Sequence, residues 1–428
     1  MILTALPSRA AAWVARWAAV LPLLGAEFIL WTGFGALLPV MPLYFTQHGV
    51  PVALLGVVIA AWPAARLVAE PVFGAFADRF PRVPLMVAGL LVAASAVGAM
   101  AVWTAPAAFV LLRALSGLGT AMYDPAARGY LTDAAPPERR GEVFGLYNAA
   151  QMGGILLGPA LGGLGTALVG GYFFVLVFGS ITTFAAALAV AVRVREIHGP
   201  RAASEPASGS LSYGEFPGER GGSGPLAPAA TLVAPPTSLR NRFILAAILV
   251  NLAGYFGGGL YETIWALFVT DHGGGVELIG ATFAVFGLVT IVLSPVAGRI
   301  VDRRGPFPFV VGGLLIMVLA MFTYPWIGEP LLYVPLVGLE AVGFSFLGPA
   351  TFLVIARGTP AGRSSTAQGV LGAAGTIGTI AAAIGSGVLA AHDLNTPFFV
   401  GSAVLLGLLA VTLAVGGAPL RSMRPEPA

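Results

Sequence analysis

The chain has 428 residues, of which 57% are hydrophobic and only 10% are charged, and its mean hydropathy is +0.89. It lacks the polar surface needed to coat a water-soluble globule, so a membrane protein is expected. The net charge is +3, and all 22 Lys or Arg residues are arginine. These arginines do not form the exposed cluster that a nucleic-acid site requires. The absence of cysteine excludes disulfides, thiolate metal sites and cysteine nucleophiles.

Apolar stretches of about 20 residues follow one another along the chain, and each can cross about 30 Å of hydrocarbon as a helix. We therefore expect an all-α integral membrane protein with twelve transmembrane helices. Because the N-terminal residues lead into the first span without a clear cleavage site, we expect an uncleaved helix rather than a signal peptide. The expected spans are 19–44, 52–74, 83–103, 106–127, 142–168, 171–192, 243–269, 277–298, 307–326, 331–356, 365–390 and 396–417.

The chain matches itself when it is shifted by 224 residues. Two tandem six-span units enter the membrane in the same direction and form parallel repeats, which are typical of secondary transporters with a site between the halves. We expect an N-terminal bundle over 1–195 and a C-terminal bundle over 243–428 around a central cavity. The matching pairs include Gly56/Gly280, Asp78/Asp302, Arg79/Arg303, Gly119/Gly343, Pro125/Pro349 and Gly163/Gly387.

Arginine marks one side of the predicted bundle. Only Arg66 and Arg113 fall inside spans, and the others lie before span 1, after even-numbered spans or after span 12. The positive-inside rule then predicts a multi-pass protein of the cell inner (plasma) membrane with both termini in the cytoplasm. Residues 196–242 are rich in Pro, Gly, Ser and Ala, and they are expected to form a flexible cytoplasmic linker.

Similar charged loops follow spans 2 and 8. A small residue at a helix end, followed by an acid and bases, can clamp neighbouring helix ends by charge. The pattern resembles the signature loop of the Major Facilitator Superfamily, which the second copy matches in full, whereas the first has Pro81 in place of a glycine. The resemblance implies a cytoplasmic charge network that reaches Asp133 at the end of span 4 and forms in only one access state. The loop residues are Gly74, Asp78, Arg79 and Arg82 in the first copy, and Gly298, Asp302, Arg303 and Gly305 in the second.

Span 5 carries glycines four residues apart, which allow another backbone to approach, and a proline that bends the helix. Generic packing of small residues would also account for this stretch. The string resembles the antiporter motif of the twelve-span drug:proton antiporter branch of the superfamily. The motif residues are Gly154, Gly158, Pro159, Gly162 and Gly163.

Span 4 contains Arg113 four residues before Gly117, which is similar to the span-4 motif of the same family. An arginine inside a span costs about 2.5–3.5 kcal/mol on insertion scales unless it is paired or hydrated, so Arg113 is expected to face a cavity. A structural ion pair is the alternative. Arg66 and Glu70 in span 2 can pair on one helix face, and for them a structural role is favoured.

Three further acids lie within spans. Glu27 and Glu340 are expected near mid-depth, one in each half, and Glu262 nearer the outer face. Their repeat positions carry no acid, so these groups are not part of the repeated scaffold. A carboxyl group in apolar surroundings can take up and release a proton near neutral pH. We expect Glu27 and Glu340 to couple transport to protons, with Arg113 biasing their titration and Glu262 as a further candidate.

Aromatic residues share helix faces with these acids. Trp31 lies four residues from Glu27, and Tyr261 and Trp265 flank Glu262. They would form cavity walls for an amphipathic substrate, with cations among the candidates. Packing within the bundle or anchoring at the membrane interface are the alternatives.

These observations predict proton-coupled efflux of small amphipathic or drug-like molecules by alternating access, through a monomer in a lipid bilayer, without cofactor or metal. A transporter for a defined sugar, peptide or lipid is the alternative within the same class. A membrane enzyme is disfavoured because the chain has no His-Glu-x-x-His or nucleotide-binding glycine motif. A sensor that does not transport would need an added soluble domain, for which only the linker is available.

Overall fold

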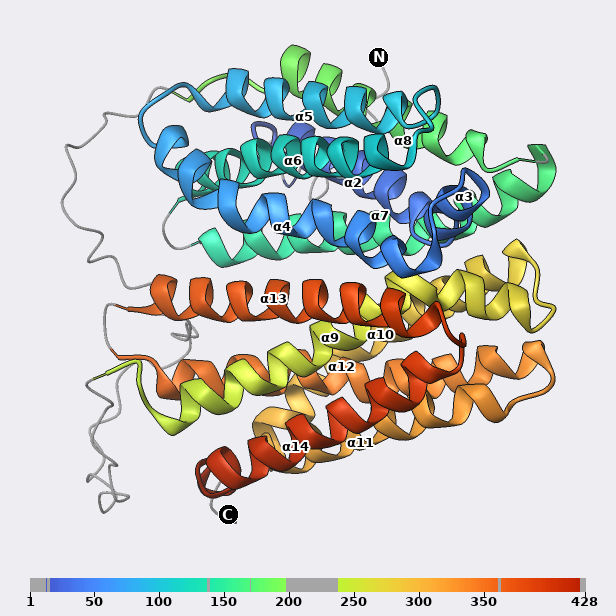
Figure 1. The fold of residues 1–428 in the computed structure, drawn as a ribbon. Coiled ribbons are helices and arrows are strands. Elements are labelled where there is room, and N and C mark those ends of the chain that lie inside the picture. The colour runs from blue at the N-terminus through green and yellow to red at the C-terminus, as the bar shows by residue number, and fades with distance from the viewer. Residues whose placement is uncertain are drawn as a thin grey trace, which may run out of the picture.

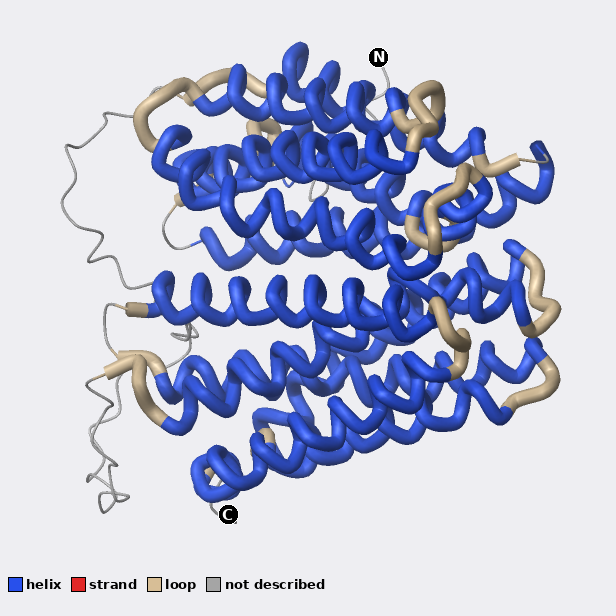
Figure 2. The backbone as a smooth tube through the Cα atoms, viewed as in Figure 1, coloured by secondary structure: helices blue, strands red, loops and turns tan. Residues whose placement is uncertain are grey.

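A computed structural model describes residues 13, 16–136, 139–169, 171–197, 238–360 and 363–423. These residues form helices joined by short loops, and no strand occurs among them (Figure 2). Eleven helices in this part of the chain are long and apolar enough to cross a membrane, and a bent pair forms a twelfth span. The expected all-α fold with twelve spans is confirmed. Most of the predicted linker, from 198 to 237, lies outside the described residues.

The first span is the bent pair, made of α2 (Leu21–Leu37) and α3 (Met41–Gln47), which meet at an angle of 48°. Pro39 lies in the break and Pro42 is the second residue of α3. Proline lacks the backbone N–H that would continue the helical hydrogen bonding, and its ring clashes with the preceding turn. The two prolines therefore explain the bend.

The other spans follow the predicted order closely. In the first half they are α4 (Val52–Ala77), α5 (Arg82–Ala99), α6 (Pro106–Ala134), α7 (Arg140–Val169) and α8 (Phe173–Arg193). In the second half they are α9 (Arg242–Asp271), α10 (Val276–Arg304), α11 (Phe307–Thr323), α12 (Tyr333–Gly358), α13 (Ser364–Ala390) and α14 (Thr396–Ser422). Short 3₁₀ turns, η3 (Tyr324–Trp326) and η4 (Pro330–Leu332), connect α11 to α12.

Helix packing repeats along with the sequence. In the first half α2 packs on α7 and α8, α6 packs on α4 and α5, and α5 packs on α8. In the second half the corresponding helices do the same: α9 packs on α13 and α14, α12 on α10 and α11, and α11 on α14. Figure 1 shows the blue-to-green helices as one bundle and the yellow-to-red helices as another. The two copies therefore share one six-helix architecture.

The described loops at one end of the bundle contain no arginine, and those at the other contain many; we call these the arginine-free and arginine-rich ends. Toward the arginine-free end, α4 of the first half crosses α13 of the second (Figure 1). A methyl group added at Gly56 would lie 1.9 Å from the carbonyl oxygen of Ala383, and one added at Gly387 would lie 2.8 Å from the Gly56 nitrogen. Only glycine permits this approach of two backbones.

The second crossing between the halves joins α7 to α10 at the same end. A methyl group at Gly280 would lie 2.9 Å from the Pro159 carbonyl oxygen, and one at Gly163 would lie 3.0 Å from that of Val276. Gly280 and Gly163 are 224 residues away from the two glycines of the first crossing. The halves are thus held together by two crossings related by the internal repeat.

Candidate functional site

Glu27 on α2 is fully buried and is held by hydrogen bonds from three helices. The Trp31 indole donates to its Oε1 at 2.8 Å, the Tyr123 hydroxyl of α6 donates to its Oε2 at 2.7 Å, and the Gln151 amide of α7 lies 3.4 Å from Oε1. Within the described residues no arginine forms an ion pair with this carboxyl group. Neutral donors alone therefore bind it. Trp31, expected as a cavity wall, positions the acid directly.

Glu340 on α12 has a similar environment in the second half, where its side chain is buried. The hydroxyls of Tyr261 and Tyr324 donate to its two oxygens at 2.7 and 2.8 Å. No ion pair reaches this carboxyl in the described chain. Each half thus encloses one carboxyl group whose partners are uncharged.

Trp265, predicted to line a cavity, instead packs in the core of the second half. Its ring is buried beside Tyr324 at a centroid distance of 4.8 Å, and its indole donates to Thr282 at 2.9 Å. We therefore correct the prediction that Trp265 is a cavity wall. Its ring packs beside those of Tyr261 and Tyr324, the two tyrosines that bind Glu340. Sequence spacing from Glu262 could not show which acid the aromatics would meet.

Counted along their own helices, the two acids lie toward opposite ends of the bundle. Glu27 is close to the start of α2 at the arginine-rich end, whereas Glu340 is close to the start of α12 at the arginine-free end. At 1.5 Å per residue, Glu27 lies about 9 Å from the first residue of α2 and Glu340 about 10 Å from the first residue of α12.

Arg113 on α6 pairs with Glu262 on α9, at 3.2 Å. This is the one ion pair between the halves among the described residues. The side chain of Arg113 is 2% exposed and that of Glu262 is 20% exposed, so only the acid has part of its surface accessible to solvent. The expected influence of Arg113 on Glu27 is not supported by contact, because Arg113 lies ten residues, or about 15 Å, along α6 from Tyr123.

The expected pair of Arg66 and Glu70 on α4 is present, with Nε of the arginine 2.7 Å from the carboxylate. The same guanidinium also pairs with Asp124 of α6, which is buried. One arginine therefore serves two carboxylates. The burial of Asp124 and its ion pair place it in one cluster of charges with Arg66 and Glu70.

A chain of aromatic rings connects these groups in the first half. The rings of Trp31 and Phe34 are 5.1 Å apart, and so are those of Phe34 and Trp62. The guanidinium carbons of Arg66 and Arg113 lie 4.7 and 5.8 Å from the centroid of Trp62. Trp62 was not singled out from the sequence, because a lone aromatic in an apolar span carries no distinguishing pattern.

The first signature loop forms part of the implied network. Arg82 pairs with Asp133 at the end of α6, and the Glu196 carboxylate accepts the backbone N–H groups of Arg82 and Val83 at 3.0 and 2.8 Å. Glu196 follows α8 and caps the start of α5, a contact that no sequence motif indicated. Pro81 precedes α5 in an extended conformation and needs no glycine geometry.

The second signature loop differs from the first in its backbone geometry and in its ion pairs. Gly305 ends α10 with φ +78°, a conformation that favours glycine. Asp302 and Arg303 form no ion pair in the described structure, and neither do Asp78 and Arg79 of the first loop. Among these residues the charge network is therefore confined to Arg82 and Asp133.

The antiporter-like stretch of α7 packs against two helices. Methyl groups at Gly154, Gly158 and Gly162 would lie 2.6, 2.5 and 2.2 Å from carbonyl oxygens of α2. The next residue, Gly163, faces α10 at the crossing described above. The close backbone approach expected from these glycines is confirmed, and it links the helix that carries Glu27 to the contact between the halves.

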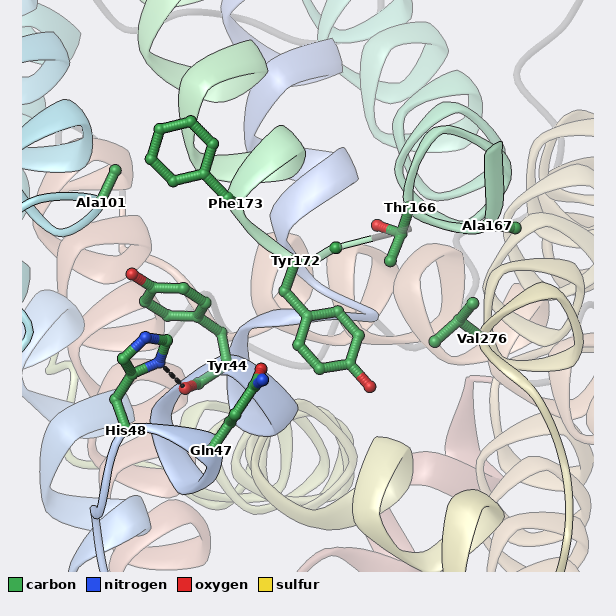
Figure 3. Close-up of a pocket in the computed structure, with 10 residues that line it drawn as sticks. Tyr44, Gln47, His48, Ala101, Thr166, Ala167, Tyr172, Phe173 and Val276 are labelled. Carbon is green, nitrogen blue, oxygen red and sulfur yellow. Dashed lines mark hydrogen bonds between the residues drawn. The ribbon is translucent and has the colours of Figure 1, made fainter. Parts of the chain in front are cut away.

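A pocket of about 590 Å³ opens at the arginine-free end, away from the acids. Figure 3 shows Tyr44, Gln47, His48 and Tyr172 around it, with Val276 contributed by the second half. The His48 ring contacts the Tyr44 carbonyl at 2.8 Å. The lining contains no carboxylate or arginine, so the charged site of the protein lies elsewhere.

Comparison with known proteins matches residues 23–383 to the Major Facilitator Superfamily. The chain belongs to this superfamily. It is 26% identical over 286 residues to multidrug resistance protein 2 of Bacillus subtilis (strain 168), covering 66% of each chain. It is 27% identical over 287 residues to the staphyloferrin B transporter of Staphylococcus aureus (strain NCTC 8325 / PS 47), covering 65% of this chain and 64% of the other. The alignments thus span somewhat less than two thirds of each relative.

The fold is similar to that of solved superfamily transporters. A bacterial homolog of the human lysosomal transporter Spinster, in an inward-facing and unoccupied conformation, matches with a TM-score of 0.72 at 16% identity. That match covers 96% of this chain and 99% of the other. This superfamily member is therefore a multi-pass membrane protein.

Proposed function

We propose that this superfamily member is a proton-coupled transporter that exports small amphipathic molecules by alternating access. The similarity to a multidrug resistance protein favours such substrates. The buried acid in each half supports coupling to protons. We assign the arginine-rich end to the cytoplasm, because arginine-rich loops are retained on that side of a membrane.

The observation that carries the proposal is the uncharged environment of Glu27 and Glu340. Both are buried, and both accept hydrogen bonds from indole, phenol or amide groups alone. A carboxylate in an ion pair must give up that pair when it takes a proton, whereas these two groups lose no cationic partner. Ionised, each would be a buried charge that only neutral donors stabilise. They are therefore the groups of the site best suited to bind and release protons.

Their positions along the membrane suit a cycle with two access states. Glu27 lies toward the arginine-rich end and Glu340 toward the arginine-free end. We take the structure to be the state closed at the arginine-free end, where glycine contacts join α4 to α13 and α7 to α10. We infer that opening this end separates the crossings and gives Glu340 access to the outside, whereas Glu27 exchanges protons with the cytoplasm.

Flux in proteoliposomes tests the proposal directly. Purified protein would be reconstituted with an acidic interior, and accumulation of ethidium and of dansylglycine would be followed by fluorescence. We expect at least one of the two to accumulate against its gradient, and nigericin, which collapses the pH gradient, should abolish this. Movement that is indifferent to the pH gradient would contradict proton coupling.

A transporter for one defined metabolite is the second candidate. The staphyloferrin B transporter is as similar to this chain as the multidrug resistance protein, so the relatives do not favour broad specificity alone. Gradient-driven movement of several unrelated dyes would favour broad export. Movement of a single chemical class would favour the specific transporter.

A further inference from the structure

Two hydrogen-bond donors beside the cross-half ion pair have no partner. Nε of Arg113 and Nε1 of Trp62 are both buried, and neither makes a hydrogen bond within the described structure. The two side chains are neighbours, since the Arg113 guanidinium carbon lies 5.8 Å from the Trp62 ring centroid, within the range of a cation–π interaction. Buried donors in proteins are almost always satisfied, so such a pair points to a binding group that arrives during function.

The hydrogen bonds that Arg113 does make are long. Both leave from Nη2, to Glu262 at 3.2 Å and to the Ile59 carbonyl at 3.3 Å. Charge-assisted hydrogen bonds between guanidinium and carboxylate groups are usually about 2.7–2.9 Å. Arg113 is thus an under-coordinated cation, and a better-placed acceptor would compete with Glu262 for it.

The carboxyl groups around the site other than Glu262 are, by contrast, already served. Glu27 and Glu340 each accept two or more hydrogen bonds, and Glu70 and Asp124 share the guanidinium of Arg66. No acid in this part of the described structure lacks a donor. The site therefore has unused hydrogen-bond donors and lacks an acceptor for them. This favours an anionic substrate over the cationic one that the acids suggested.

We propose that the transported molecule carries a carboxylate next to an aromatic ring, and that this carboxylate binds Arg113 and Trp62 in place of Glu262. The ring of the substrate would lie against Trp62, Phe34 and Trp31, whose rings form one continuous wall. Because Glu262 belongs to the second half, its displacement breaks the ion pair that joins the halves. Substrate binding would then loosen the closed state. This inference rests on the proposed transport function and names its substrate class.

Equilibrium binding to the purified protein in nanodiscs tests this inference without any gradient. Three probes share one dansyl group: dansylglycine with a carboxylate, dansylglycinamide without charge, and dansylcadaverine with an ammonium group. We expect dansylglycine to bind about ten-fold more tightly than the other two, the size of effect that one charge-assisted hydrogen bond gives. Tighter binding of the ammonium probe, or no binding of dansylglycine, overturns the proposal.

Two variants identify the site. Trp62→Phe keeps the ring but removes the donor, so it should weaken dansylglycine several-fold and leave dansylcadaverine unchanged. Trp17→Phe is the matched control, because Trp17 also has a buried indole N–H without a partner in the described structure, but it precedes α2 and lies in the hydrophobic core of the first half. Glu262→Gln frees Arg113 and should strengthen dansylglycine binding. An equal loss in both tryptophan variants, or weaker binding in Glu262→Gln, contradicts the assignment.

This binding result is separable from the proposed function. If the carboxylate preference is absent but a pH gradient still drives ethidium uptake, the substrate class is wrong and proton-coupled export stands. If the preference is present but no probe moves with the gradient, the binding site stands and the coupling fails.

Discussion

The two halves share a scaffold but differ in their chemistry. Their helices pack in the same pattern, and their glycine crossings occupy equivalent positions. Yet the first half carries a cluster around Arg66 that the second half lacks: the positions equivalent to Arg66, Glu70, Arg113 and Asp124 hold Thr290, Ser294, Val337 and Gly348. The internal repeat therefore preserves backbone packing, whereas the charged groups within the spans are placed separately in each half.

Backbone crossings tolerate almost no substitution, because an added methyl group would overlap a carbonyl oxygen. A polar side chain in a span needs only a suitable partner, and that partner can lie on any neighbouring helix. This difference explains why glycines recur at the repeat spacing and the acids inside the spans do not. It also implies that the two kinds of position will respond differently to mutation.

The largest effect should come from the cluster found only in the first half. Arg66→Leu leaves Glu70 and Asp124 without their cation, and removing one partner of a buried ion pair typically costs about 3–5 kcal/mol. Thr290→Val at the equivalent position should be neutral or stabilising, because the buried Thr290 hydroxyl has no hydrogen-bond partner in the described structure. Thermal unfolding of both variants in detergent measures the contrast. Equal losses would show that the halves are not chemically distinct here.

The next effect concerns the shared crossings. Gly387→Ala puts a methyl group 2.8 Å from the Gly56 nitrogen, whereas Gly385→Ala on the same helix meets nothing within 4 Å. We expect the first variant to reduce flux about thirty-fold and the second to leave it within two-fold, since overpacking costs about 1–3 kcal/mol. Initial transport rates in proteoliposomes provide the comparison. Full activity of Gly387→Ala would remove the crossing from the closing mechanism.

The sequence predicted those contacts that depend on local spacing. The pairing of Arg66 with Glu70 follows from their separation of one helical turn, and the glycine spacing of α7 indicated its approach to a neighbouring backbone. The partners of Arg113 and Glu27 on other helices could not be predicted. Glu262 is 149 residues from Arg113, and Tyr123 is 96 residues from Glu27. Such pairs depend on helix rotation and depth, which hydropathy does not specify.

A smaller effect should separate the two signature loops. Gly305→Ala places a side chain at φ +78° and should cost about 1–2 kcal/mol. Pro81→Ala keeps an ordinary extended conformation, so the loss should stay below about 1 kcal/mol. The shift in thermal midpoint of each variant measures this difference. A larger loss for Pro81→Ala would mean that the first loop, too, depends on special backbone geometry.

The smallest effect concerns charges in these loops. Arg82→Gln removes the ion pair with Asp133 and should slow flux about three-fold, as expected for a partly exposed pair worth under about 1 kcal/mol. Asp78→Asn and Asp302→Asn should change flux less in this access state, because neither acid forms an ion pair in the described structure. A larger loss in Asp78→Asn than in Arg82→Gln would indicate that Asp78 acts in the other access state.

The central claim is that one uncompensated acid in each half carries protons. It is tested most directly by pH-gradient-driven flux of Glu27→Gln and Glu340→Gln in proteoliposomes, with the probe that the unaltered protein accumulates. Glutamine mimics the protonated acid, so we expect each variant to lose accumulation against the gradient while retaining downhill exchange of the same probe. Full gradient-driven accumulation by both variants would contradict the account and move the coupling to Glu262 or Glu70.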